Sequence, residues 1–180
     1  MAATKKSFPP SEEGIFTHQG PGEKWNRVVG KPVSIFYRRA KDGRIKQTHI
    51  ACISTVRDDD NVEHDVLVVS FAKTATEDMK GGTATRQTGR AVAAHRLAKF
   101  LKKSPSDRLK RLPHMIGVWG YDQDPDSSEP SMKMIFPPMG IFKTSDSESK
   151  KNVMRRAWVD LPNEDRLLRT FERLGTEIEE

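Results

Sequence analysis

The chain has 180 residues, of which 35% are hydrophobic and 31% are charged, and it carries a formal net charge of +6. This composition is typical of one globular domain with polar connections, and the positive charge favours anionic partners such as nucleic acid. No stretch approaches the roughly 18 consecutive apolar residues that span a bilayer, and residues 1–10 lack the apolar core of a signal peptide. We therefore predict a cytoplasmic protein with no membrane partner.

Residues 1–26 are rich in proline, glycine and charge. Such a segment buries too little apolar surface to offset its loss of conformational entropy, so it is predicted to be a flexible N-terminal arm. Its apolar side chains Phe16 and Trp25 are predicted to dock on the body or on a partner subunit, which leaves self-association open. Residues 27–180 are predicted to form a single α+β domain.

Residues 32–56 show the alternation expected of a β-hairpin. Its turn is Lys41–Arg44, in which Gly43 can adopt a positive φ. After a polar turn at residues 57–61, the run Val66–Ala72 is almost entirely apolar, which is typical of a strand buried on both faces. Three strands joined by short connections predict an antiparallel meander.

A helix is predicted from Gly89 to Lys103. On a projection at about 100° per residue its apolar side chains share one arc, which holds Ala91, Ala94, Leu97, Ala98 and Leu101. The opposite arc is basic and holds His95, Arg96, Lys99, Lys102 and Lys103. The helix is expected to end at Ser104, because Pro105 disfavours a helical conformation in the residue before it.

Two further strands, at residues 115–121 and 131–136, are predicted to form a second hairpin, with the strand order left open. A C-terminal helix is predicted from Pro162 to Leu174, with Gly175 as its C-terminal cap. The predicted fold is α+β: an antiparallel sheet of about five strands, packed by one amphipathic basic helix and completed by a C-terminal helix. Mobile segments are expected near residues 73–88, 122–130 and 143–152.

The positive charge is concentrated in one segment. Residues 86–111 contain nine basic residues and one acid, Asp107, so their charge of +8 exceeds that of the whole chain. Lysine and arginine bind phosphate backbones, with salt-dependent release of counterions. The predicted nucleic-acid-binding residues are Arg86, Arg90, Arg96, Lys99, Lys102, Lys103, Arg108, Lys110 and Arg111. The alternative, that these side chains form the solvated side of an amphipathic helix, stays open, as does the choice between DNA and RNA.

Arg86 and Arg90 support a narrower hypothesis. They lie four residues apart, next to the apolar side of the predicted helix and after the long loop at residues 73–88. An arginine in that position either pairs with an acid, for which Glu77 and Asp78 are nearest in sequence, or faces an anionic ligand. The loop lacks the Gly-Lys-Ser or Gly-Lys-Thr of a P-loop, so nucleotide binding is not predicted.

No catalytic constellation is predicted. The five histidines do not form a close metal-ligand pair, and Cys52, the one cysteine, is expected to be a small buried hydrophobe. The acids at residues 58–60, with Glu63 and Asp65, lie in or beside a predicted turn, where solvation is expected rather than metal binding. The sequence therefore predicts no catalytic residue, metal site or cofactor, and it favours a non-enzymatic protein over an enzyme of nucleic-acid metabolism.

The stretch Val66–Leu101 resembles small proteins of tailed bacteriophages and related mobile elements. Those proteins often show an apolar strand that ends in a serine-phenylalanine or similar pair, a short polar loop, and a helix of the form Gly-Arg-x-x-Ala-x-x-Arg-Leu, and the loop with Gly81 and Gly82 is longer than theirs. Here the pair is Ser70-Phe71, and the helix motif runs from Gly89 to Leu97. The resemblance implies a viral or mobile-element origin, and hence the host cytoplasm, but it transfers no catalytic residue.

Together these features favour a non-enzymatic nucleic-acid-binding accessory protein, encoded by a phage or mobile element, that contacts the phosphate backbone through its basic helix. The alternative is a protein-interaction module, such as a phage structural component or an inhibitor of a host factor, whose arms reach a partner. Phe36, Tyr37 and Trp119 lie on predicted strands, where they are either core residues or a platform on which bases stack.

Overall fold

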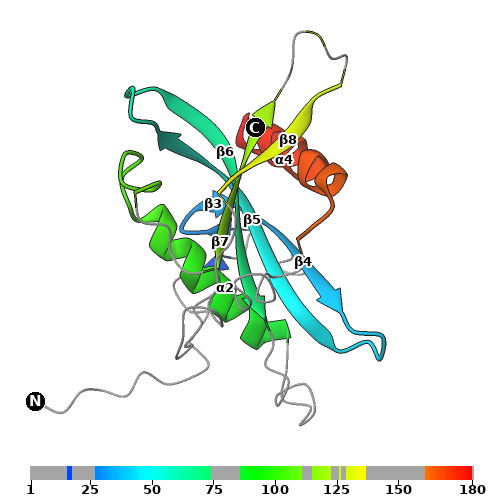
Figure 1. Ribbon diagram of the computed structural model, residues 1–180. Helices are drawn as coiled ribbons and strands as arrows, with labels where there is room; N and C mark the ends of the chain where they lie inside the picture. The colour runs from blue at the N-terminus through cyan, green and yellow to red at the C-terminus, as the bar shows by residue number, and fades with distance from the viewer. Residues whose placement is uncertain are drawn as a thin grey trace, which may run out of the picture.

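The computed structural model describes residues 16–17, 27–73, 86–110, 115–122, 126, 129–136 and 161–179. Within these ranges the fold is α+β, as predicted, with a five-stranded antiparallel sheet and two helices (Figure 1). Most of the predicted mobile segments near 73–88, 122–130 and 143–152 lie outside the described residues. Glu77 and Asp78, the predicted partners of Arg86 and Arg90, also lie outside them.

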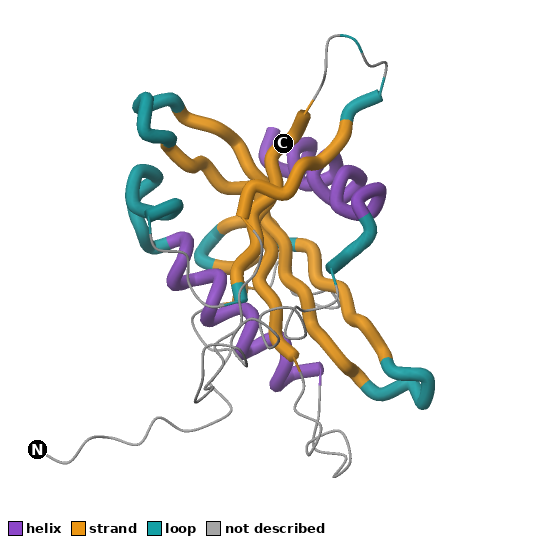
Figure 2. The backbone as a smooth tube through the Cα atoms, viewed as in Figure 1, coloured by secondary structure: helices purple, strands orange, loops and turns teal. Residues whose placement is uncertain are grey.

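The strand order of the main sheet follows the chain. Its strands are β4 (Ser34–Arg39), β5 (Ile45–Arg57), β6 (Glu63–Lys73), β7 (Ile116–Asp122) and β8 (Ser131–Phe136). Every neighbouring pair is antiparallel, so the meander predicted for the first three strands extends to all five. Helix α2 (Arg86–Leu101) comes between β6 and β7, and α4 (Glu164–Glu179) follows β8. Figure 2 shows how strongly the strands twist across one another between the helices.

A second, smaller sheet is built from three two-residue strands. They are β1 (Phe16–Thr17), β2 (Arg27–Val28) and β3 (Lys31–Pro32), in that order. The β1 residues belong to the predicted N-terminal arm, and they pair with β2. The rest of the arm, including Trp25, lies outside the described residues.

The strand β6 is buried on both faces, as its apolar run predicted. Alternate residues of a strand point to opposite faces, and here Val66 and Val68 pack in one hydrophobic cluster while Leu67 and Val69 pack in another. The first cluster contains side chains of α2, and the second contains Leu167 and Leu174 of α4. Helix α2 therefore covers one face of the sheet, and α4 covers the other.

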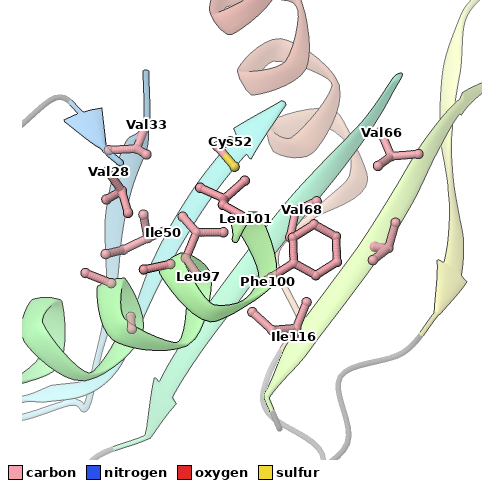
Figure 3. Packing of buried hydrophobic residues seen from close by; sticks show 14 of the residues in the cluster. Val28, Val33, Ile50, Cys52, Val66, Val68, Leu97, Phe100, Leu101 and Ile116 are labelled. Carbon is pink, nitrogen blue, oxygen red and sulfur yellow. The ribbon is translucent and has the colours of Figure 1, made fainter. Parts of the chain in front are cut away.

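The face under α2 is packed by small and branched side chains. The five apolar residues that the helical projection placed on the core arc are all buried, and so are the adjoining Ala93 and Phe100. Figure 3 shows Leu97, Phe100 and Leu101 pointing from the helix onto the strands that carry Ile50, Cys52 and Val68. The apolar arc of the predicted helix is confirmed as its buried side.

Gly89 allows α2 to approach β5 closely. A Cβ at this position would lie 2.1 Å from Oγ1 of Thr48, a distance that real side chains do not reach. A second contact joins the helix to β6, because the Ser70 hydroxyl donates a hydrogen bond of 2.7 Å to the Ala93 carbonyl. The helix is thus fixed to both strands by contacts that only small or hydroxyl-bearing residues can make.

Both helices differ from their predicted bounds. Helix α2 begins at Arg86, three residues before the predicted Gly89, and it ends at Leu101. Helix α4 begins after Asn163, whose side chain accepts a 2.8 Å hydrogen bond from the Asp165 amide, as an N-cap residue does. The prediction of Gly175 as a C-terminal cap was wrong, because the helix continues through it to Glu179. Glycine in a helix interior costs only about 1 kcal/mol, which the surrounding packing can offset.

Replacing Gly89 by alanine should destabilise the fold. The added methyl group would clash with Thr48, and overpacking of this kind costs about 1–3 kcal/mol, measurable as a lower urea midpoint. Gly175→Ala is the matched control, because its Cβ would lie 3.9 Å from the nearest atom of Ile53 and should be neutral or slightly stabilising. Equal stability of the two variants would show that the close approach at Gly89 is unimportant. Adding Thr48→Ala to Gly89→Ala should recover part of the loss.

Candidate nucleic-acid interface

Lysines gather on the outward side of α2 and in the turn that follows it. Lys99 and Lys102 are exposed, and Lys103 is half-buried just after the helix ends. In the part of the chain that the structure describes, neither Lys99 nor Lys102 forms an ion pair or a hydrogen bond through its side chain. The sequence of α2 contains no aspartate or glutamate at all. Within the described residues, Lys99 and Lys102 therefore present positive charge to solvent without a paired carboxylate.

Arg96, predicted to lie on the same basic surface, is instead half-buried. Its Nη1 donates a hydrogen bond of 2.5 Å to the Phe71 carbonyl near the end of β6. Burial lowers the pKa of its guanidinium from the ordinary value, because the charged form loses part of its hydration. Arg96 therefore holds α2 onto β6, and only the remaining part of its guanidinium can meet a ligand.

Arg108 has an even clearer structural position. Its side chain is buried, and it donates hydrogen bonds to the carbonyls of Thr55 (2.5 Å) and Leu101 (3.0 Å). Desolvation lowers the pKa of this guanidinium from its ordinary value. Its Cζ also lies 5.7 Å from the centroid of the Phe100 ring, within reach of a cation–π contact. Arg108 joins the end of α2 to β5.

The other predicted contact residues are spread over different surroundings. Arg90 is half-buried, and its Nη1 lies 3.4 Å from the Tyr37 hydroxyl, to which it donates a hydrogen bond. Lys110 is exposed and forms an ion pair with Asp107 at 3.7 Å. The side chain of Arg86 and the whole of Arg111 lie outside what the structure describes. The structure thus brings Lys99, Lys102 and Lys103 together on one side of α2.

Two of the three strand aromatics are core residues. Phe36 and Trp119 are buried, so they offer no face on which a base could stack, whereas Tyr37 is half-buried. Phe36 packs edge-on against the buried His49, whose ring also meets Phe71 at a centroid distance of 4.9 Å. Within the described residues, recognition of single strands by stacking on Phe36 or Trp119 is excluded.

The acidic turn after β5 is held by local contacts. The Asp58 carboxylate accepts hydrogen bonds from His64 (2.7 Å) and from the Val62 amide (2.9 Å), and the His64 contact in particular lowers the pKa of Asp58. Glu63 pairs with Arg57, and Asp65 accepts a hydrogen bond from Thr55. In the described ranges, no three His, Cys, Asp or Glu side chains are arranged to hold a metal ion.

A set of arginines on α4 was missed by sequence reasoning. Arg166, Arg169 and Arg173 line a groove of about 540 Å³ together with Thr170 and with residues 34–36 of β4. Their spacing of three and four residues along one side of α4 is the signal that could have revealed them, with Asp165 and Glu172 at the neighbouring positions four residues before and three residues after Arg169. These arginines lie on the face of the sheet opposite to α2.

Comparison of the chain with protein-family models, with curated proteins and with solved structures gives no match. Among the described residues, no helix has both the length and the apolar character needed to cross a membrane.

Arg108 and Lys110 should respond differently to removal of their charge. Arg108→Met leaves two buried carbonyls without their donor and should lower the free energy of unfolding by about 2–3 kcal/mol. Lys110→Met removes only the exposed ion pair with Asp107, so its free energy of unfolding should stay within about 0.5 kcal/mol of the wild-type value. Urea unfolding of both variants measures the difference. Similar, small effects in both would contradict the structural position of Arg108.

The Cys52 thiol is fully buried, and desolvation raises its pKa from 9.0 to about 12. An unfolded chain therefore loses this proton first, so the contribution of the buried thiol to stability is complete below pH 9 and declines as the pH rises toward 12. Replacement by valine, which does not ionise, should make the alkaline loss of stability smaller. Urea unfolding of wild type and Cys52→Val across this pH range tests the expectation, which parallel curves would contradict.

Proposed function

We propose that the protein is a non-enzymatic nucleic-acid-binding accessory protein. The observation that carries the proposal is the exposed lysine surface of α2, which has no carboxylate within the helix to neutralise it. Lys99, Lys102 and Lys103 form its centre, with Lys110 beyond the end of the helix. Contacts of this kind bind the phosphate backbone without reading sequence. The resemblance to phage and mobile-element proteins adds a proposed viral or mobile-element origin.

The arginines and lysines of the basic segment differ in their surroundings, and this difference supports the lysines as the phosphate-binding residues. Arg96 and Arg108 reach backbone carbonyls within the fold, whereas Lys99 and Lys102 extend into solvent. Lysine binds phosphate as a flexible point charge, without the fixed bidentate geometry of arginine. The proposed interface therefore favours affinity through counterion release over sequence specificity. DNA and RNA are both candidates.

Fluorescence anisotropy with labelled single- and double-stranded oligonucleotides tests the proposal. At about 50 mM salt the wild-type protein should bind, and the affinity should fall steeply as salt is raised. Lys99→Gln with Lys102→Gln removes two phosphate contacts, so it should weaken binding by about tenfold. The slope of log affinity against log salt concentration should become smaller by about two.

The matched control removes the same charge elsewhere. Lys41→Gln with Lys133→Gln changes one exposed lysine in the β4–β5 turn and one on β8, and it should retain most of the affinity. If both double variants lose affinity equally, net charge accounts for the binding and the surface of α2 has no special role. No binding by the wild type at low salt would overturn the proposal outright.

A further inference from the structure

The groove beside α4 is cationic and is built between a helix and an edge strand. Arg166, Arg169 and Arg173 lie within a stretch of eight residues of α4, which covers about 10 Å along a helix from the first to the last. Ser34, Ile35 and Phe36 of β4 form the other wall, and none of the described residues that line the groove carries a carboxylate. The groove therefore has three guanidinium groups along one wall and a β-strand along the other.

The three guanidinium groups are held by neutral partners. Arg166 lies with its Cζ 4.4 Å from the centroid of the Phe36 ring, and Arg173 donates a 2.5 Å hydrogen bond to the Ser34 hydroxyl. Arg169 donates to the backbone carbonyl of Asp165 on its own helix. Within the described residues none of the three forms an ion pair with a carboxylate. Their orientation is fixed while their charge stays available to a ligand.

The wall formed by β4 is the outer edge of the sheet. In the described ranges β4 has one strand neighbour, β5, and the other side of its backbone pairs with no strand. Ile35 lines the groove although its side chain packs against the cluster on the α2 face. The groove therefore reaches the backbone edge of β4 itself. An unpaired edge of this kind offers N–H and C=O groups to an added strand.

We propose that this groove binds an extended acidic peptide of a partner protein, which adds to β4 as a sixth strand. Peptide residues opposite Phe36 and Ser34 would point toward α4, where their carboxylates would meet the three arginines. The residue between them, opposite Ile35, would point to the α2 face, where an apolar or β-branched side chain fits. About three extended residues match the span of the arginines. The preferred pattern is acidic, apolar, acidic.

Other occupants fit the groove less well. A base has no ring to stack on, because Phe36 is only 5% exposed and is covered by Arg166. A nucleic-acid backbone also cannot form a β-ladder with the strand edge. A second copy of β4 would bring Arg38 and Arg39 against the same cationic groove, and like charges disfavour that pairing.

The test uses the full chain and a fluorescein-labelled peptide of alternating glutamate and valine. Anisotropy should show binding at about 50 mM salt, whereas the matched peptide of alternating glutamine and valine should bind much more weakly. Arg169→Gln with Arg173→Gln should weaken binding of the acidic peptide by about tenfold or more. Methylating every second amide nitrogen of the peptide should also weaken binding, because a methylated amide cannot donate to β4.

Lys99→Gln with Lys102→Gln is the control on the opposite face, and it should leave peptide affinity within about twofold of the wild type. Equal losses in the two double variants, an unchanged affinity of the methylated peptide, or no binding at all would overturn the proposal. An oligonucleotide that loses affinity in the Arg169/Arg173 variant but not in the Lys99/Lys102 variant would instead assign the groove to nucleic acid. Thermal melts establish whether each variant is folded. If the double variant is not folded, the single variant Arg169→Gln replaces it in the binding measurement.

Discussion

The double-sided burial of β6 is the constraint on which the rest of the structure depends. Seven consecutive residues, Val66–Ala72, are buried, and their side chains alternate between two hydrophobic clusters. A strand of this kind is stable only where both faces of the sheet are covered. Helix α2 provides one cover and α4 the other, so the two cationic surfaces that these helices carry lie on opposite sides of the molecule. The placement of the charges follows from the burial of one strand.

The sequence predicted the elements whose hydrophobic pattern is visible within a single segment. The apolar run of β6 and the arc from Ala91 to Leu101 both depend on spacing that an isolated segment displays. The destinations of Arg96 and Arg108 were not predictable in this way, because each reaches a carbonyl of a strand that lies far away in sequence. The strand order likewise depends on tertiary pairing. The α4 arginines show a readable period, but their significance depends on the neighbouring edge of β4.

Net charge also proves to be a poor guide to which cations can bind a partner. Arginine and lysine both contribute to the charge of the basic segment, yet the buried Arg108 donates to backbone carbonyls while Lys99 and Lys102 extend into solvent. A guanidinium has several donors in a fixed plane, so it can satisfy buried carbonyls that an ammonium group matches less well. The groove on α4 shows the opposite use of arginine, where neutral partners orient the side chains and no carboxylate among the described residues pairs with them.

The insertion of α2 between two adjacent strands has a consequence for how the sheet assembles. Ser70 pairs with Ile116, which lies 46 positions further along the chain, whereas the partners in β5 and β6 are joined by a short turn. Loop-closure entropy disfavours the distant pair until something brings β7 near β6. When α2 docks on β5 and β6 through Gly89 and Ser70, the loop that must still close between α2 and β7 is much shorter, so its entropic cost is lower. We therefore expect β7 and β8 to join the sheet after α2 has packed on the sheet formed by the first three strands.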